Sequence, residues 1–178
     1  ALAADERDRC LLPVDALLDW CRGVAGACLD GVTLSGGEPF DQPQALQCLL
    51  NGFAAWRTRD ALDFDLLCYS GWPMRELERR HPRVLALLDA VIPEPFIDAR
   101  PTARPWRGSE NQPIVPLTPL GVARYGAADA HVHDPRLQVR VDGERIWYIG
   151  IPRHGDMDRL ENRCRERGLE FKGVSWRA

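Results

Sequence analysis

The sequence predicts an α/β fold with a parallel sheet, followed by a small ββαβ extension. Short β-rich runs alternate with helical segments, and each of the first runs ends at a turn rich in glycine or proline. Farther along the chain, Asp142-Gly143 lies between two alternating runs and is a strong hairpin signal. We therefore expect a main domain over residues 1–135 and an extension over residues 136–178 that packs on it.

The first three strands are expected at residues 31–35, 64–69 and 91–92. Three turns follow them directly and read GGEP, YSG and PEP. Ligands of parallel sheets usually bind at the carboxyl ends of the strands. We therefore expect the functional site at the edge where these turns meet.

Helical periodicity predicts the segments between the strands. The first helix covers Val14–Arg22, and a second is expected to begin at Asp41 as its N-cap. A third begins at Pro73 and is broken by Pro82. The pattern thus places a helix after each of the first two strands.

The region after the third strand is rich in proline, arginine and glycine. Residues 98–135 are expected to be mostly irregular, apart from an apolar run at 114–117. In the extension, a helix over 156–167 is expected to end at Gly168, and a last strand to follow over 169–176.

The composition is that of an ordinary globular protein, with 45% hydrophobic and 28% charged residues over 178 positions. The net charge of −3 argues against broad electrostatic binding of nucleic acid or anionic lipid. No apolar run is long enough to span a membrane, and no leader-like segment opens the chain. We expect a cytoplasmic protein with neither nucleic-acid nor membrane partners.

The cysteines show no metal-binding spacing, so no metal ligands are assigned in this chain. In a cytosolic protein such cysteines are more often small buried hydrophobic residues than ligands. Cys48 in a helical apolar pattern and Cys68 in a strand-like run support this interpretation. The roles of Cys10 and Cys28 stay open.

The sharpest local signal is Ser35-Gly36-Gly37-Glu38-Pro39, between a strand and a helix. Two glycines let a ligand approach the backbone without a Cβ in the way, and the proline stiffens the exit. Such a loop edge could bind a ligand that carries both an ammonium and a carboxylate group. Taken alone, however, GGEP is more often a plain structural turn.

Four segments of the chain form an ordered set. They are DGVTLSGGEPFDQP (30–43), LLCYSGW (66–72), DAVIPEPFID (89–98) and RPWRGSENQ (104–112). In this order they resemble the radical S-adenosylmethionine (SAM) activating enzymes, in particular those of anaerobic ribonucleotide reductase. The resemblance covers residues 11 to about 120 and implies that the α/β domain is a partial radical-SAM-type (βα) barrel.

The resemblance implies SAM and a [4Fe–4S] cluster as cofactors. In the family, a CxxxCxxC loop holds the cluster, and an electron from it cleaves SAM to methionine and a 5′-deoxyadenosyl radical. The implied partners are a glycyl-radical enzyme, which is activated, and a flavodoxin or ferredoxin, which supplies the electron.

The chain departs from the family in two places. The CxxxCxxC loop is absent, and Cys10, Cys21 and Cys28 cannot replace it because a helix separates the first two. We therefore expect the cluster ligands upstream of Ala1, an active full-length enzyme, and no SAM cleavage by this chain alone. The family's Asp-Gly pair is Pro93-Glu94 here, so an acidic group is kept but displaced.

The resemblance also implies the site residues. The SAM-binding set is Ser35, Gly36, Gly37, Glu38, Pro39, Tyr69 and Ser70. The loop expected to face the substrate or partner contains Arg107, Ser109, Asn111 and Gln112. No catalytic residue is assigned.

Alternatives stay open at three points. Arg100, Arg104 and Arg107 could clamp a carboxylate or phosphate, or belong to a solvated loop. His131, His133 and Asp134 have the pattern of a metal site, although exposed loop histidines are commoner. The whole chain could also be a cluster-less relative that acts as a SAM-binding or regulatory subunit.

Overall fold

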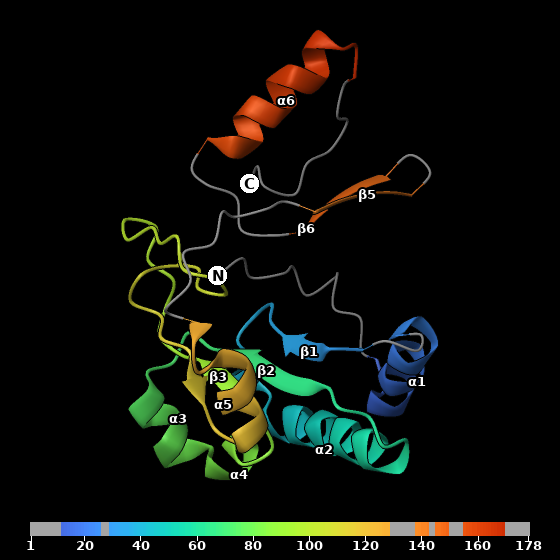
Figure 1. Ribbon diagram of the computed structural model, residues 1–178, viewed down its shortest axis with the longest axis vertical. Coiled ribbons are helices and arrows are strands. Elements are labelled where there is room, and N and C mark those ends of the chain that lie inside the picture. Colours follow the sequence, from blue (N-terminus) through green and yellow to red (C-terminus); the bar gives the residue numbers. More distant parts are fainter. Residues whose placement is uncertain (1–11, 26–28, 129–137, 143–144, 150–154, 170–178) are drawn as a thin grey trace. The chain divides into compact units, whose positions relative to one another are not determined.

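The structure is a computed structural model that describes residues 12–25, 29–128, 138–142, 145–149 and 155–169 (Figure 1). The chain divides into two compact units, residues 1–132 and 133–178. The described part of the first unit holds a sheet with its helices, and that of the second holds a hairpin and one helix. Among the described residues, no helix is long and apolar enough to cross a membrane.

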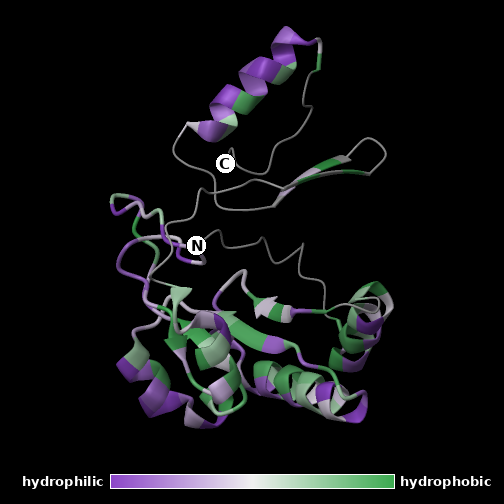
Figure 2. Ribbon diagram, in the orientation of Figure 1, coloured by the Kyte–Doolittle hydropathy of each residue, from purple (hydrophilic) through white to green (hydrophobic). Residues whose placement is uncertain are grey.

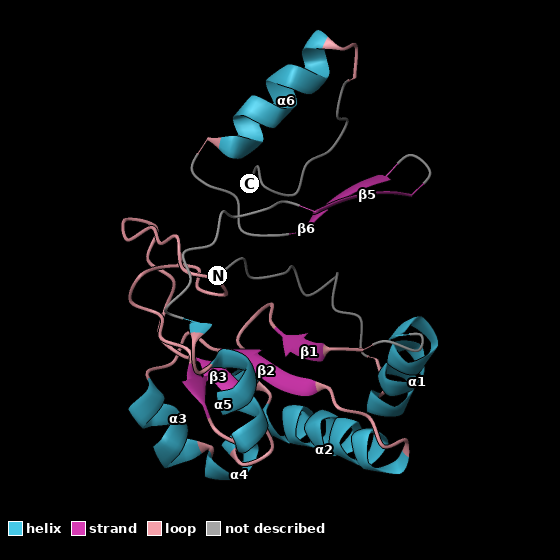
Figure 3. Ribbon diagram, viewed as in Figure 1, coloured by secondary structure: helices cyan, strands magenta, loops and turns pink. Residues whose placement is uncertain are grey.

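The sheet of the first unit has four strands in sequential order (Figure 3). Strands β1 (Gly31–Leu34), β2 (Asp65–Tyr69) and β3 (Ala90–Ile92) are parallel. The short strand β4 (Val115–Pro116) pairs with β3 in the antiparallel direction. The prediction of an α/β fold with a mainly parallel sheet is confirmed.

Four helices belong to the core on one face of the sheet. They are α1 (Val14–Ala25), α2 (Pro43–Arg59), α3 (Met74–Arg80) and α4 (Pro82–Leu85). Leu66 and Cys68 of β2 pack into this core, whereas the alternate residue Leu67 packs on the opposite face against Tyr125. Strand residues alternate between the two faces, and β2 is apolar from Leu66 to Cys68 because both faces are covered. Figure 2 shows β2 as mainly hydrophobic, whereas α3 is mainly hydrophilic.

The start of α2 differs from the sequence prediction. Residues Pro39–Asp41 form a 3-10 turn, and α2 begins at Pro43 with Gln42 as its N-cap. The expected N-cap, Asp41, is therefore one residue too early. The reason is that Glu38 caps the 3-10 turn, since its side chain accepts a hydrogen bond from the Phe40 amide.

The expectation that 98–135 is mostly irregular is wrong over one helix, α5 (Pro119–Tyr125). Thr118 is its N-cap, and the hydroxyl accepts a 3.2 Å hydrogen bond from the Gly121 amide. Tyr125 is buried and donates a 2.9 Å hydrogen bond to Asp65. The Thr-Pro pair that begins α5 is a helix-start signal that the sequence contained.

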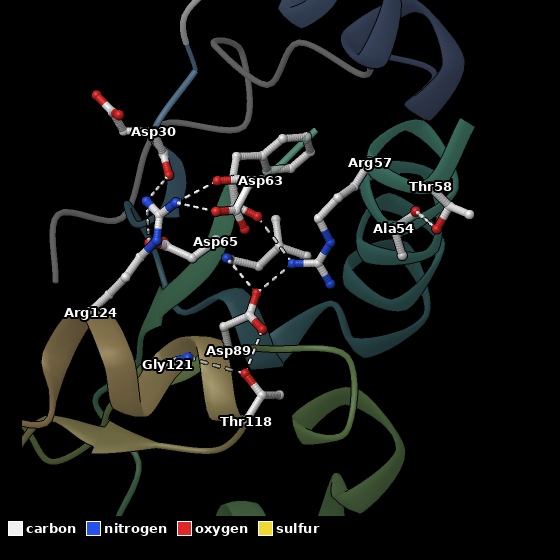
Figure 4. Close-up of polar contacts among 12 residues, drawn as sticks. Asp30, Ala54, Arg57, Thr58, Asp63, Asp65, Asp89, Thr118, Gly121 and Arg124 are labelled. Atoms are coloured by element: carbon white, nitrogen blue, oxygen red, sulfur yellow. Dashed lines mark hydrogen bonds and ion pairs between the residues drawn. The ribbon is translucent and has the colours of Figure 1, made fainter. Parts of the chain in front are cut away.

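Two acidic side chains lie buried at the amino ends of the strands (Figure 4). Asp65 begins β2 and forms an ion pair with Arg124 of α5 at 3.2 Å. Asp89 directly precedes β3 and forms an ion pair with Arg57 of α2 at 2.7 Å. Burial raises the pKa of Asp65, although Tyr125 and Arg124 act in the opposite direction. Each carboxylate thus ties a helix to the end of the sheet away from the glycine loop.

The second unit contains β5 (Gln138–Asp142), β6 (Arg145–Ile149) and α6 (Asp156–Glu166). The strands form an antiparallel hairpin, as the Asp-Gly signal predicted. Gly168 has φ of +77° just after α6, the left-handed conformation that a C-terminal glycine provides. The last strand expected at 169–176 falls almost wholly outside the described residues.

Candidate functional site

The carboxyl ends of the parallel strands bring three turns together. The Ser70 amide donates to the carbonyl of Ile92 at 2.9 Å, which joins the β2 turn to the end of β3. The Glu94 amide donates to the carbonyl of Trp72 at 3.0 Å, which is a second hydrogen bond between the β2 turn and the segment after β3. The glycine loop after β1 joins them through Glu38. The three turns therefore meet at the carboxyl ends of the parallel strands, and this edge is the candidate site.

The glycine loop presents bare backbone to solvent. Ser35, Gly36 and Gly37 are all exposed. Gly36 has φ of +126°, a conformation that residues with a side chain rarely adopt. A Cβ at either Gly36 or Gly37 would meet no atom within 4 Å. The loop edge is thus open to a ligand, and its amides and carbonyls can be approached closely.

Pro39 and Phe40 fix the exit of the loop. Pro39 begins the 3-10 turn, and the Phe40 ring is only 1% exposed in the main core. The ring contacts His81, with the ring centroids 5.4 Å apart, and His81 contacts Trp72 at 5.6 Å. This aromatic row joins the glycine loop to the β2 turn.

Glu38 binds the protein on both carboxylate oxygens. Its Oε1 accepts hydrogen bonds from the Ser70 hydroxyl at 2.8 Å and from the Phe40 amide at 3.1 Å. Its Oε2 accepts one from the Gly71 amide at 2.7 Å. The structure therefore brings Glu38 and Ser70 together, and their contact bridges the glycine loop and the β2 turn.

Tyr69 and Ser70 are held by intramolecular contacts. Ser70 is 3% exposed, and its hydroxyl also accepts a 3.1 Å hydrogen bond from the Trp72 amide. The Tyr69 hydroxyl donates to the backbone carbonyl of Trp106. Burial raises the pKa of Tyr69 to about 12, so this hydroxyl stays protonated at neutral pH. Tyr69 thereby joins the site to the 104–112 loop.

The polar residues of that loop bind the backbone that follows β3. Gln112 donates to the carbonyl of Glu94 at 2.8 Å, and Asn111 donates to that of Pro95 at the same distance. The Ser109 hydroxyl accepts from the Ile97 amide at 3.1 Å. Ser109 and Gln112 are buried, as is Arg107. The hydrogen bonds of Ser109, Asn111 and Gln112 thus hold the segment 94–97 against the 104–112 loop.

Glu94 has φ of +80°, a left-handed conformation unusual for a residue with a side chain. In the resemblance described above, this position corresponds to the glycine of the Asp-Gly pair, a residue that would adopt such a φ freely. The hydrogen bonds of its amide to Trp72 and of its carbonyl to Gln112 hold this conformation. Sequence reasoning noted the substitution but missed the strain, which the replaced glycine could have indicated.

The arginines of the alternative clamp have different environments. Arg100 is exposed. Arg104 lies 3.4 Å from Glu110 in an ion pair on the loop surface. Arg107 is buried at 8% exposure. His131, His133 and Asp134 lie outside the described residues.

The cysteines that the structure describes do not form a cluster site. Among the described residues, no group of three or more His, Cys, Asp or Glu side chains could hold a metal ion. Burial raises the pKa of Cys68 to about 12, which keeps it a thiol rather than a metal-binding thiolate. Cys48 is exposed, so the prediction that it is a buried hydrophobic residue is wrong. Cys10 and Cys28 lie outside the described residues.

Comparison with known proteins gives two matches. Residues 15–115 match the family described as the 4Fe-4S single cluster domain. The chain is also 36% identical over 87 residues to the anaerobic ribonucleoside-triphosphate reductase-activating protein of Haemophilus influenzae. That match covers 47% of this chain and 54% of the relative, so it spans about half the length of the curated protein. No solved structure matches the chain.

Proposed function

Because the chain belongs to the family of 4Fe-4S single cluster domains, we propose that it forms the SAM-binding part of an iron–sulfur protein that cleaves SAM reductively. The observation that carries this proposal is the exposed backbone of Gly36 and Gly37 at the carboxyl ends of parallel strands. Such edges are where α/β sheets bind their ligands. The likeness to a ribonucleotide reductase-activating protein supports the same function.

The glycine loop would bind the methionine end of SAM. Backbone carbonyls near Gly36 and Gly37 would accept hydrogen bonds from the ammonium group, and backbone amides would donate to the carboxylate. Ser35 is exposed beside them and would flank the ligand. Tyr69 and Ser70 would form the neighbouring wall, because the β2 turn is bound to the loop through Glu38.

The iron–sulfur cluster, when bound, supplies the electron that cleaves SAM. The described residues do not fit a cluster, because they offer no group of side chains that could hold a metal ion. We therefore derive no step through it from this chain. Its ligands are proposed to come from residues outside those that the structure describes.

We further propose that the sheet is part of a radical-SAM-type barrel and that its partner is a glycyl-radical enzyme. The segment 94–97 and the 104–112 loop would face that partner. They expose two aromatic rings, Phe96 at 60% and Trp106 at 47%, and such rings are enriched at protein interfaces. A flavodoxin or ferredoxin would supply the electron.

The test is SAM cleavage by the natural full-length protein. The protein is reconstituted anaerobically with iron and sulfide, reduced with dithionite, and followed by chromatography for 5′-deoxyadenosine. We expect about four irons per chain and 5′-deoxyadenosine above the level of a cluster-free control. Iron incorporation without 5′-deoxyadenosine, or no iron at all, would contradict the enzymatic function.

A second candidate is a cluster-less SAM-binding or regulatory subunit. The observation behind it is that neither Cys68, a buried thiol, nor Cys48, exposed on another element, is placed to hold a cluster. The same reconstitution separates the two functions. SAM binding by a full-length protein that takes up no iron would select the regulatory function.

A further inference from the structure

Within the proposed SAM site, we infer that Glu38 is a positioning residue that sets the β2 turn, and that its carboxylate does not contact the ligand. The inference rests on the proposed function. It starts from the contacts of Glu38 with Ser70 and Gly71, which lie 32 and 33 residues farther along the chain.

Most of the acceptor capacity of the carboxylate is already used by the protein. Both oxygens accept hydrogen bonds, with one donor, the Phe40 amide, inside its own loop and two donors in the β2 turn. All three lengths, 2.7 to 3.1 Å, are those of well-formed hydrogen bonds. If the carboxylate turned to the ammonium of a ligand, the Phe40 and Gly71 amides would lose their acceptor. A backbone amide without an acceptor carries a free-energy cost wherever water does not replace it.

The bonds of Glu38 propagate to the rest of the edge. The Ser70 hydroxyl that donates to Glu38 accepts from the Trp72 amide. The carbonyl of Trp72 in turn accepts from the Glu94 amide after β3. The carboxylate therefore fixes the position of the β2 turn relative to the glycine loop. These two segments line the proposed SAM site, so their separation depends on Glu38.

Glu38→Gln tests the role of the second oxygen. The amide side chain can still accept from Ser70 and Phe40 on its oxygen, but its NH₂ group then faces the Gly71 amide, and two donors cannot bond. Ser70→Ala removes the other contact from the opposite side. Glu78→Gln is the matched control, because it makes the same change on an exposed glutamate of α3.

The first readout does not depend on SAM. It is the NMR spectrum of the ¹⁵N-labelled chain. In Glu38→Gln, we expect the resonance of the Gly71 amide proton to move upfield and this proton to exchange faster with solvent. The Trp72 amide should do the same in Ser70→Ala, and neither should change in Glu78→Gln. Unchanged Gly71 and Trp72 amides in folded variants would overturn the inference.

The second readout uses SAM and the reconstituted full-length protein. We expect the KM for SAM to rise about tenfold or more in each single variant, with kcat at saturating SAM changed less than about twofold. The double variant should show little further loss, because both changes release the same turn. Additive effects, or faster exchange of the wild-type Gly71 amide when SAM is added, would mean that the carboxylate binds the ligand and would overturn the inference. If wild-type protein binds no SAM, the proposed function fails, while the amide readout still decides the positioning role.

Discussion

The guanidinium of Arg57 on α2 lies 2.7 Å from the carboxylate of Asp89, which directly precedes β3 (Figure 4). Asp89 also accepts hydrogen bonds from the Leu66 amide and the Thr118 hydroxyl. One buried carboxylate thus joins α2, β2 and the start of α5. We infer that Asp89 is an important polar contact at the amino ends of the strands.

Asp89→Ala is expected to lower the free energy of unfolding by about 3 kcal/mol, the low end for breaking a buried ion pair. The low end applies because the Arg57 side chain is 27% exposed and water can reach it after the change. Urea unfolding followed by circular dichroism measures the effect. Asp98→Ala, on an exposed loop aspartate, should change stability by less than about 0.5 kcal/mol. Equal effects of the two variants would contradict this role of Asp89.

Gly121 allows α5 to lie directly on the backbone before β3. A Cβ at this position would stand 1.9 Å from the carbonyl oxygen of Asp89. Gly121→Ala must therefore displace α5, and we expect a loss of about 3 kcal/mol or more in the free energy of unfolding. Gly23→Ala in α1 is the matched control, because a Cβ there meets no atom within 4 Å. It should be neutral or stabilise the fold by up to about 1 kcal/mol, and thermal unfolding of both variants distinguishes the two cases.

The sequence predicted the strands and their turns well because both signals are local. Apolar β-rich runs followed by glycine or proline located β1, β2 and β3 to within a residue or two. Helix α5 was missed because it has seven residues, only two of which are buried, Gly121 and Tyr125. Its position depends on Asp89 and Asp65, partners far away in the sequence. Local periodicity carries no information about such contacts.

The location of the candidate site could be predicted from the sequence, but the hydrogen-bond partners of its side chains could not. The bridge between Glu38 and Ser70 exists only because β1 and β2 pair in parallel and bring their carboxyl ends together. Gln112 and Asn111 likewise find backbone acceptors 18 and 16 residues away. Exposure of Cys48 was not predictable either, since an apolar helical pattern does not tell which face a borderline residue occupies.

Glu94→Gly is expected to stabilise the protein. The φ of +80° costs a residue with a side chain about 1 kcal/mol, and glycine adopts it freely. Against this gain stands the larger entropy of glycine in the unfolded chain, so we expect a net increase of up to about 1 kcal/mol in the free energy of unfolding. Glu94→Ala keeps the Cβ and therefore the strain, and it should give no increase. Chemical unfolding of both variants measures the difference, and an equal change in both would assign the effect to the lost carboxylate.

Cys68 should make the protein less stable at alkaline pH. Its pKa is about 12 in the folded chain because of burial, against 9.0 for an ordinary thiol. The stabilisation is therefore complete below pH 9 and is lost as pH rises toward 12, because only the unfolded chain releases the proton in that window. The slope is about 1.4 kcal/mol per pH unit for one group. Urea unfolding at pH 8 and pH 10.5 should show the wild-type advantage over Cys68→Ala shrinking, and a constant difference would contradict the raised pKa.

Gly37→Val is expected to leave the fold intact and to weaken SAM binding. A Cβ at Gly37 meets no atom within 4 Å, and its φ lies outside the left-handed region, so the side chain fits the free protein without strain. In the complex, however, the isopropyl group would occupy the space through which the methionine end of SAM approaches the backbone. We expect affinity to fall by about a hundredfold or more, because the side chain would keep the ligand from hydrogen bonding to the backbone of the loop. Titration calorimetry on the reconstituted full-length protein measures this, and urea unfolding verifies that stability is unchanged.

Gly36→Ala provides the contrast. The φ of Gly36 is +126°, so a side chain at this position should lower the free energy of unfolding of the protein even without ligand. Wild-type SAM affinity in a stably folded Gly37→Val variant would mean that the glycine loop is only a turn between β1 and α2.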